Sequence, residues 1–147
     1  MEVIQSRTQL YKMLGIVGAV LLLLAGSLWT TVSVRRYARD AVRLSVTREL
    51  YLGLELYFAK NNSYPLGNNM VLGGPQAGCL DEKGFHARGT CNGIVYLPFI
   101  APDIAGKTFS YSYDAGPPAG YMVQFVTEGS IQTFREGNHV MTPNSMK

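Results

Sequence analysis

The chain has no proline before Pro65 and no charged residue from position 13 to position 34. As an α-helix, the uncharged run of about 22 residues spans about 33 Å, enough to cross the hydrocarbon core of a bilayer. A cleaved secretory signal is disfavoured, because the run is too long and no small-residue cleavage site follows it. We therefore expect a transmembrane part at 13–34, preceded by a short polar and basic segment at 1–12.

The same absence of proline lets the helix continue beyond the membrane. In residues 35–61 apolar positions recur at spacings of three and four, and the turn signal Asn61-Asn62-Ser63-Tyr64-Pro65 follows them. This pattern predicts one helix of about 50 residues, apolar in its first half and amphipathic in its second.

The motifs of common enzyme classes are also missing. Neither G-x-S-x-G nor a glycine-rich phosphate loop is present. His86 and His139 lie in separate predicted loops, without the spacing of a ligand pair or a nucleophile motif nearby. Asp81 and Glu82 are adjacent, so on a strand they would face opposite ways, which disfavours an acid–base pair. We expect no enzyme, no catalytic residue, no cofactor and no small-molecule substrate.

Basic residues exceed acidic ones only slightly, and those in the C-terminal half are sparse and mixed with Asp and Glu. A nucleic-acid surface would need clustered Lys and Arg interleaved with aromatic residues. The composition therefore disfavours nucleic acid as a partner.

The chain has two cysteines, Cys79 and Cys91, in a glycine-rich stretch. No histidine pair or second cysteine pair completes a zinc site. A disulfide would suit a small exported domain, since closing this loop stabilises the fold by about 2 to 3 kcal/mol. Two reduced cysteines are the alternative.

Two apolar lines run along residues 35–61. The members of the first recur at spacings of three and four and are expected to pack on the protein's own sheet: Leu44, Thr47, Tyr51, Leu54 and Phe58. The second, at Val42, Leu52 and Leu56, lies around the other side of the helix beside Glu49. It is either part of a broad core or a seam for a neighbouring copy's helix. Gly53, between the lines, allows close helix approach or a local bend.

Beyond Pro65 the sequence predicts a loop region at 62–107, with a short edge strand at 94–100 interrupted by Pro98. Strands are expected at 108–113, 121–127 and 131–135, within a sheet and tail region at 108–147. Phe109, Tyr111 and Tyr113 would share one face. The predicted fold is α+β: a long N-terminal helix packed on a small three- to four-stranded antiparallel sheet.

The end of the helix reads Leu54-Glu55-Leu56-Tyr57 and is followed by Tyr64-Pro65. This pattern resembles the type IV pilins and the pseudopilins of type II secretion. The resemblance extends to the segment KTFSYSYDAGPPAGYMVQFVTEGSIQTFREGNHVMTPNSM, which looks like the closing sheet of that family. It implies a pilin-like fold and a structural role in a filament, with copies of itself or related subunits as partners. It also raises calcium as an alternative at Asp103 and Asp114, although no dense Asp/Asn cluster supplies the oxygens and we expect no metal site.

The N-terminal segment departs from this family, whose members carry a basic leader ending in glycine and then Phe-Thr-Leu-Ile-Glu. Counting back by the family spacing puts the mature start near Thr8, with Arg7 where glycine belongs and Lys12 where glutamate belongs. Gly15 is a second candidate, but Val20 stands at its glutamate position. This divergence favours an uncleaved, minor or accessory component.

Orientation is contested by the flanking charges. Arg7 and Lys12 precede the apolar run, and four arginines follow it: Arg35, Arg36, Arg39 and Arg43. The positive-inside rule alone would put the C-terminus in the cytoplasm. The cysteines and the resemblance favour a single-pass protein of the cytoplasmic membrane with its C-terminal domain outside, or within a periplasmic or extracellular filament.

The expected function is thus a structural, membrane-anchored subunit of a pilus or secretion-type filament. The alternative is an uncleaved, membrane-anchored binding module for adhesion or DNA uptake, acting through the loop around Cys79 and Cys91.

Overall fold

The computed structural model describes residues 2–103, 105–107, 109–116 and 120–146. The chain forms two compact units, Met1–Arg36 and Tyr37–Lys147. The long helix α1, Glu2–Asn61, supplies the first unit and the beginning of the second. Helix therefore also covers the described part of the polar segment 1–12, where the sequence shows no period of its own.

In the first unit, the apolar side chains of α1 that the structure describes from Met13 to Leu24 are exposed. The helix from Tyr11 to Asn61 contains an 18-residue window with a mean hydropathy of 2.1, none of which is buried in the protein. By length and composition this helix can cross a membrane.

The helix ends where the sequence predicts a turn. Asn62 adopts a left-handed conformation with φ of 53°, and its N–H donates to the carbonyl of Phe58 at 2.7 Å. Asparagine tolerates this conformation and often closes a helix in this way. The chain then reverses through Pro65, whose carbonyl accepts a hydrogen bond from the buried Tyr111 hydroxyl at 2.6 Å.

The second unit contains two antiparallel sheets. The larger has the order β1-β5-β6-β7-β8. Its strands are β1 (Met70–Val71), β5 (Phe109–Asp114), β6 (Gly120–Thr127), β7 (Gly137–Thr142) and β8 (Ser145–Met146). The smaller has the order β3-β2-β4. Its strands are β2 (Cys79–Asp81), β3 (Gly84–His86) and β4 (Val95–Leu97).

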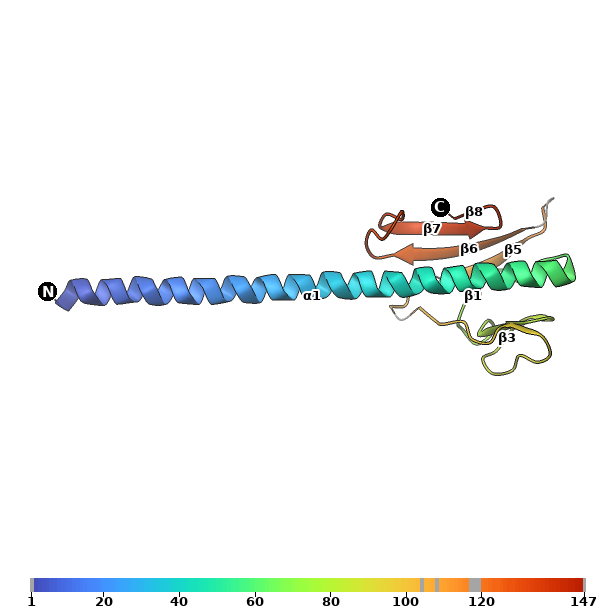
Figure 1. Cartoon of the computed structure of the whole chain (residues 1–147), viewed down its shortest axis with the longest axis horizontal. Coiled ribbons are helices and arrows are strands. Elements are labelled where there is room, and N and C mark those ends of the chain that lie inside the picture. The colour runs from blue at the N-terminus through green and yellow to red at the C-terminus, as the bar shows by residue number, and fades with distance from the viewer. Residues whose placement is uncertain (1, 104, 108, 117–119, 147) are drawn as a thin grey trace. The chain divides into compact units, whose positions relative to one another are not determined.

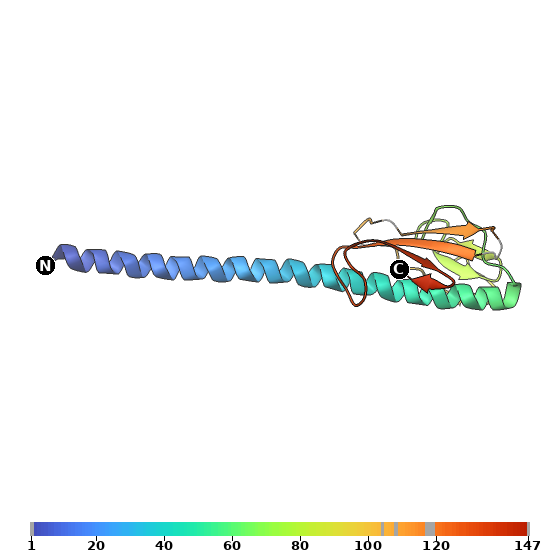
Figure 2. The same ribbon diagram turned by 90° about the horizontal axis from the view of Figure 1, so that it is seen from above.

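The C-terminal part of α1 lies against both sheets (Figures 1 and 2). In Figure 1 strands β5 to β8 are above the helix and the smaller sheet is below it, whereas Figure 2 shows both on the same side of the helix. The core between them holds side chains from helix and strands, with Leu44, Leu50, Leu54, Tyr111, Val123, Phe125 and Met141 all at most 2% exposed. The predicted α+β class, a long helix packed on antiparallel sheet, is confirmed.

Two predicted strands correspond to β5 and β6, although Thr108 and residues 117–119 of the intervening turn lie outside the described residues. The strand predicted at 131–135 is wrong. Ile131 and Phe134 instead pair with each other in a tight turn, each N–H donating to the other's carbonyl at 2.9 Å. Ile131 is buried, so its apolar character serves as an anchor for this turn. Strand β7 begins later, at Gly137.

The region 62–107, predicted as a loop, contains β1 to β4. None of these strands exceeds three residues, which is too short to show an alternating pattern. The short apolar run around Val95 forms β4, at the edge of the smaller sheet before Pro98, where proline is tolerated.

Candidate assembly surface

The amphipathic part of α1 separates two kinds of side chain. Leu44 and Leu54 are 2% and 0% exposed against the sheets, and Tyr51 and Phe58 are half-buried beside them. On the far side, the second apolar line remains open to solvent: Val42 is 44% exposed, Leu52 61% and Leu56 56%. Glu49 lies on this open face, where Ser45 Oγ donates to its carboxylate at 3.4 Å. The open face is thus a surface that the protein's own sheets do not cover.

Gly53 lies where the Leu97 side chain of β4 packs closely against the helix. A Cβ at this position would lie 2.5 Å from Cγ of Leu97 on β4. Tyr57, one turn further along, packs edge-to-face on Tyr96 of the same strand, with ring centroids 5.9 Å apart. The sequence analysis raised a close helix approach or a bend at Gly53, whereas the structure places the subunit's own strand β4 against this position.

Near the beginning of the second unit, charged side chains from three distant segments converge. The Arg43 guanidinium contacts Asp40 on the next helical turn at 2.6 Å, Asp103 in the loop after β4 at 2.9 Å, and Glu128 after β6 at 2.7 Å. Arg39 forms a bidentate pair with Glu128. The Arg43 side chain is 6% exposed, so its charge is balanced within the fold.

Asp40 adds a second link from the helix to the turn after β6. Its carboxylate accepts hydrogen bonds from the backbone N–H of Glu128 at 3.0 Å and of Gly129 at 2.9 Å. The Asp40 carboxylate thus gives partners to two backbone N–H groups of this turn, and charge-assisted bonds of this kind are strong. Asp40 and Arg43 together join α1 to the turn that follows β6.

This cluster changes the protonation of Glu128. The hydrogen bond from Arg39 lowers the pKa of Glu128 to about 2, with Arg43 adding to the effect and burial opposing it. The carboxylate therefore stays ionised down to strongly acidic pH.

From the sequence, Arg39 and Arg43 were treated only as basic residues that follow the apolar run, and the charged cluster was not predicted. Asp40 and Arg43 stand at an i, i+3 spacing, a local signal for a helical ion pair. Asp103 and Glu128 carried no such signal. Arg35 and Arg36, at the end of the first unit, are exposed, whereas Arg39 and Arg43 in the second unit are paired.

The calcium alternative is not supported at either aspartate. Both Asp103 oxygens contact the Arg43 guanidinium, and Asp103 Oδ1 also accepts the N–H of Ala105. Asp114 Oδ1 accepts the N–H of Gly116 in a local turn. Among the residues that the structure describes, no three His, Cys, Asp or Glu side chains form a group that could hold a metal ion.

Cys79 and Cys91 form a disulfide, with their Cα atoms 6.2 Å apart. It closes the segment that contains the β2–β3 hairpin. Inside this segment the buried Asp81 accepts the N–H of Lys83 at 2.8 Å and of Asn92 at 3.0 Å. Burial acts to raise the pKa of Asp81, but these backbone hydrogen bonds lower it below its ordinary range. The disulfide and Asp81 thus order the same segment.

The remaining polar candidates have structural contacts. His86 Nε2 lies 3.2 Å from Asp81 Oδ1 within the disulfide-closed segment. His139 on β7 packs between Phe125 and Phe134, and its Nε2 lies 2.7 Å from the carbonyl oxygen of Arg135. The two histidines lie on strands of different sheets.

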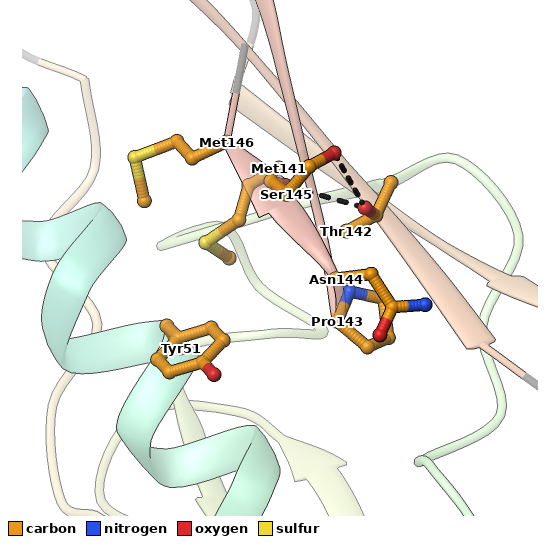
Figure 3. Close-up of a pocket in the computed structure, with 7 residues that line it drawn as sticks. All are labelled: Tyr51, Met141, Thr142, Pro143, Asn144, Ser145 and Met146. Atoms are coloured by element: carbon orange, nitrogen blue, oxygen red, sulfur yellow. Dashed lines mark hydrogen bonds between the residues drawn. The ribbon is translucent and has the colours of Figure 1, made fainter.

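A groove of about 260 Å³ lies between α1 and the β7–β8 hairpin. In Figure 3, Tyr51 points from the helix toward the hairpin, and the side chains of Met141 and Met146 extend toward the helix. Thr142 Oγ1 is engaged with the Ser145 carbonyl and hydroxyl, at 3.2 Å each. The lining is mainly apolar and contains no acid–base pair.

Comparison of the chain with protein-family models, with curated proteins and with solved structures gave no match.

Proposed function

We propose that this chain is a membrane-anchored, pilin-like structural subunit, which assembles with copies of itself or with related subunits by packing helix against helix. The observation that carries the proposal is the open face of α1. Val42, Leu52 and Leu56 are all more than two-fifths exposed on a helix whose opposite face is buried in its own sheets. Apolar side chains gathered on one surface commonly mark a protein–protein contact.

The fold is consistent with this role. A helix long and apolar enough to span a membrane continues into a small α+β unit, and the helix ends in the Tyr64-Pro65 turn that resembles the pilin family. The disulfide favours an oxidising compartment, so the proposal puts the C-terminal unit outside the cytoplasm. Its work is structural rather than enzymatic.

The proposal is tested by charging the open face. Leu56→Glu in the full-length protein should leave the second unit folded, because this side chain is 56% exposed. It should abolish crosslinking between cysteines introduced on neighbouring α1 helices in the membrane, since assembly would bury the new charge. Protease resistance and an intact Cys79–Cys91 bond report the fold.

Leu66→Glu is the matched control, because Leu66 is 79% exposed but lies beyond the end of the helix. It should leave crosslinking unchanged. Crosslinking that survives in folded Leu56→Glu protein would show that assembly does not use this face.

A second candidate, a membrane-anchored binding module, is favoured by exposed apolar side chains just beyond the disulfide-closed segment. Ile94 is 48% exposed and Phe99 is 43% exposed, with the Arg88 guanidinium 4.4 Å above the Phe99 ring. For this candidate, Phe99→Ser should reduce adhesion or DNA uptake of cells that express the protein while helix crosslinking remains normal. If Phe99→Ser reduces neither adhesion nor DNA uptake, this surface is not a binding site and the second candidate loses its support.

A further inference from the structure

The open face of α1 has a regular repeat. Val42, Glu49 and Leu56 follow one another at seven-residue intervals, and all three are exposed. A parallel line at the same interval is also exposed along its whole length: Ala38, Ser45, Leu52 and Ala59. Positions seven apart drift by only about 20° around a helix, so each line stays on one side. We call the two lines together the heptad strip.

A heptad strip is the surface that one helix presents to another. Alternating steps of three and four residues place side chains as knobs that enter the holes of a facing helix. Ala38, Ser45 and Ala59 are small, which permits close approach, while Leu52 and Leu56 supply apolar area. The repeat therefore indicates a helix as the occupant of this face.

The helix that fits this description is α1 of a second copy. Copies inserted through the same apolar segment would enter a membrane in the same direction and at the same depth. A parallel pair in equal register brings each strip position opposite itself, which is the self-complementary geometry of a two-fold contact.

Equal register makes Glu49 the critical position. It is the strip's charged residue, and in the pair it would face the partner's Glu49 between the layers of Ser45 and Leu52. Ser45, its hydrogen-bond partner, is neutral. The adjacent Arg48 is engaged with Gln132 at 2.6 Å, and Lys60 lies about three helical turns further on. Two facing carboxylates carry the same charge and repel each other.

We propose that the heptad strip is a parallel self-association surface on which Glu49 weakens the contact at neutral pH, so that a neutral side chain at this position strengthens it. This inference rests on the proposed function and adds the partner, the register and the residue that sets the strength of the contact.

The test uses full-length protein in liposomes equilibrated to one pH on both faces. Ala59→Cys places a thiol on the strip, and both native cysteines are already in the disulfide. In equal register the two new thiols lie within the range that a disulfide requires, so an added oxidant should produce a covalent dimer. Leu66→Cys, exposed but off the strip, gives the baseline for random collision.

Glu49→Gln is then combined with Ala59→Cys. Self-association at pH 7 should become about tenfold tighter, read from dimer yield across a series of protein-to-lipid ratios. Glu136→Gln, which neutralises an exposed carboxylate away from the helix, should have no effect.

The outcomes separate the inference from the proposed function. If Ala59→Cys dimers form but do not respond to Glu49→Gln, the role of Glu49 is refuted and helix packing stands. If Ala59→Cys gives no more dimer than Leu66→Cys while Leu56→Glu still disrupts assembly, the equal register is wrong. If Ala59→Cys stays at baseline and Leu56→Glu changes nothing, both the inference and the proposed function fail.

Discussion

Arg43 and Asp103, 60 residues apart in the chain, form a two-point ion pair. Arg43 Nη2 donates to Asp103 Oδ1 at 2.9 Å, and Nε donates to Oδ2 at 3.1 Å. Both side chains are 6% exposed. A buried guanidinium held by both oxygens of a carboxylate has a specific geometry. Removing either partner is costly, because the other charge is then left buried without a counter-charge or water.

Removing the cation should therefore destabilise the second unit strongly. We expect Arg43→Met to lower the free energy of unfolding by about 3 to 5 kcal/mol, since Asp40 and Asp103 stay buried without their counter-charge. Arg48→Met is the control, because Arg48 is exposed and bonds Gln132, and it should cost no more than about 1 kcal/mol. Chemical unfolding of the full-length protein in detergent measures both. Similar losses in the two variants would contradict the buried-cluster interpretation.

Acid should weaken the same cluster. Arg39 and Arg43 lower the pKa of Glu128 in the folded protein from its ordinary value of 4.5 to about 2. The unfolded state takes up the proton first, so this contribution is present above about pH 4.5 and is lost as the pH falls toward 2. The loss is on the order of 1 to 3 kcal/mol after allowance for solvent screening.

Glu128→Gln should flatten this part of the pH dependence, leaving the smaller contribution of Asp81, whose pKa is also lowered. Unfolding titrations at pH 7, 4.5 and 3 provide the comparison. An unchanged acid slope in Glu128→Gln would show that other carboxyl groups govern acid stability.

The two faces of α1 should differ in their tolerance of truncation. Leu54→Ala leaves a cavity under the sheets and should cost about 2 to 4 kcal/mol, because Leu54 is 0% exposed. Leu52 lies on the open face and is 61% exposed, so Leu52→Ala should change the stability of the monomer by no more than about 0.5 kcal/mol. Thermal melts in dilute detergent distinguish them, and equal losses would mean that the faces are not distinct.

Gly53 and Leu97 should be energetically coupled. Gly53→Ala should destabilise the protein despite the better helix propensity of alanine, since its Cβ meets the Leu97 side chain at 2.5 Å. Adding Leu97→Ala removes the obstruction. The loss of stability in the double variant should therefore be about 1 to 2 kcal/mol smaller than the sum of the losses in the two single variants. A cycle that closes additively would show that the helix moves away from β4 without cost.

The disulfide should stabilise the segment that contains β2 and β3. Cys79→Ser with Cys91→Ser is expected to cost about 2 to 3 kcal/mol by the chain-entropy argument. Maleimide labelling of denatured, non-reduced protein from its native membrane should find neither thiol reactive. Labelling of both thiols would remove the disulfide and the main support for an oxidising compartment.

Local sequence periodicity determined the helix and two of the three longer strands, β5 and β6. The uncharged run at 13–34, the absence of proline before Pro65 and the three- and four-residue spacing through Leu44 and Leu54 each indicate helix without reference to distant residues. Alternation likewise located β5 and β6, and the pair of cysteines in a short glycine-rich stretch pointed to the disulfide. Such signals are readable because each repeats over several neighbouring residues.

Only the tertiary structure decided the rest. The partners of Arg43 lie 60 and 85 residues away, so no local pattern could connect them. Strands β1 to β3 are too short to carry a period, and Ile131 belongs to a turn because its side chain is anchored in the core. The open state of Val42, Leu52 and Leu56 depended on which helix face the sheets would cover. Burial is a property of the packed unit, and the helical repeat alone defines faces without assigning their neighbours.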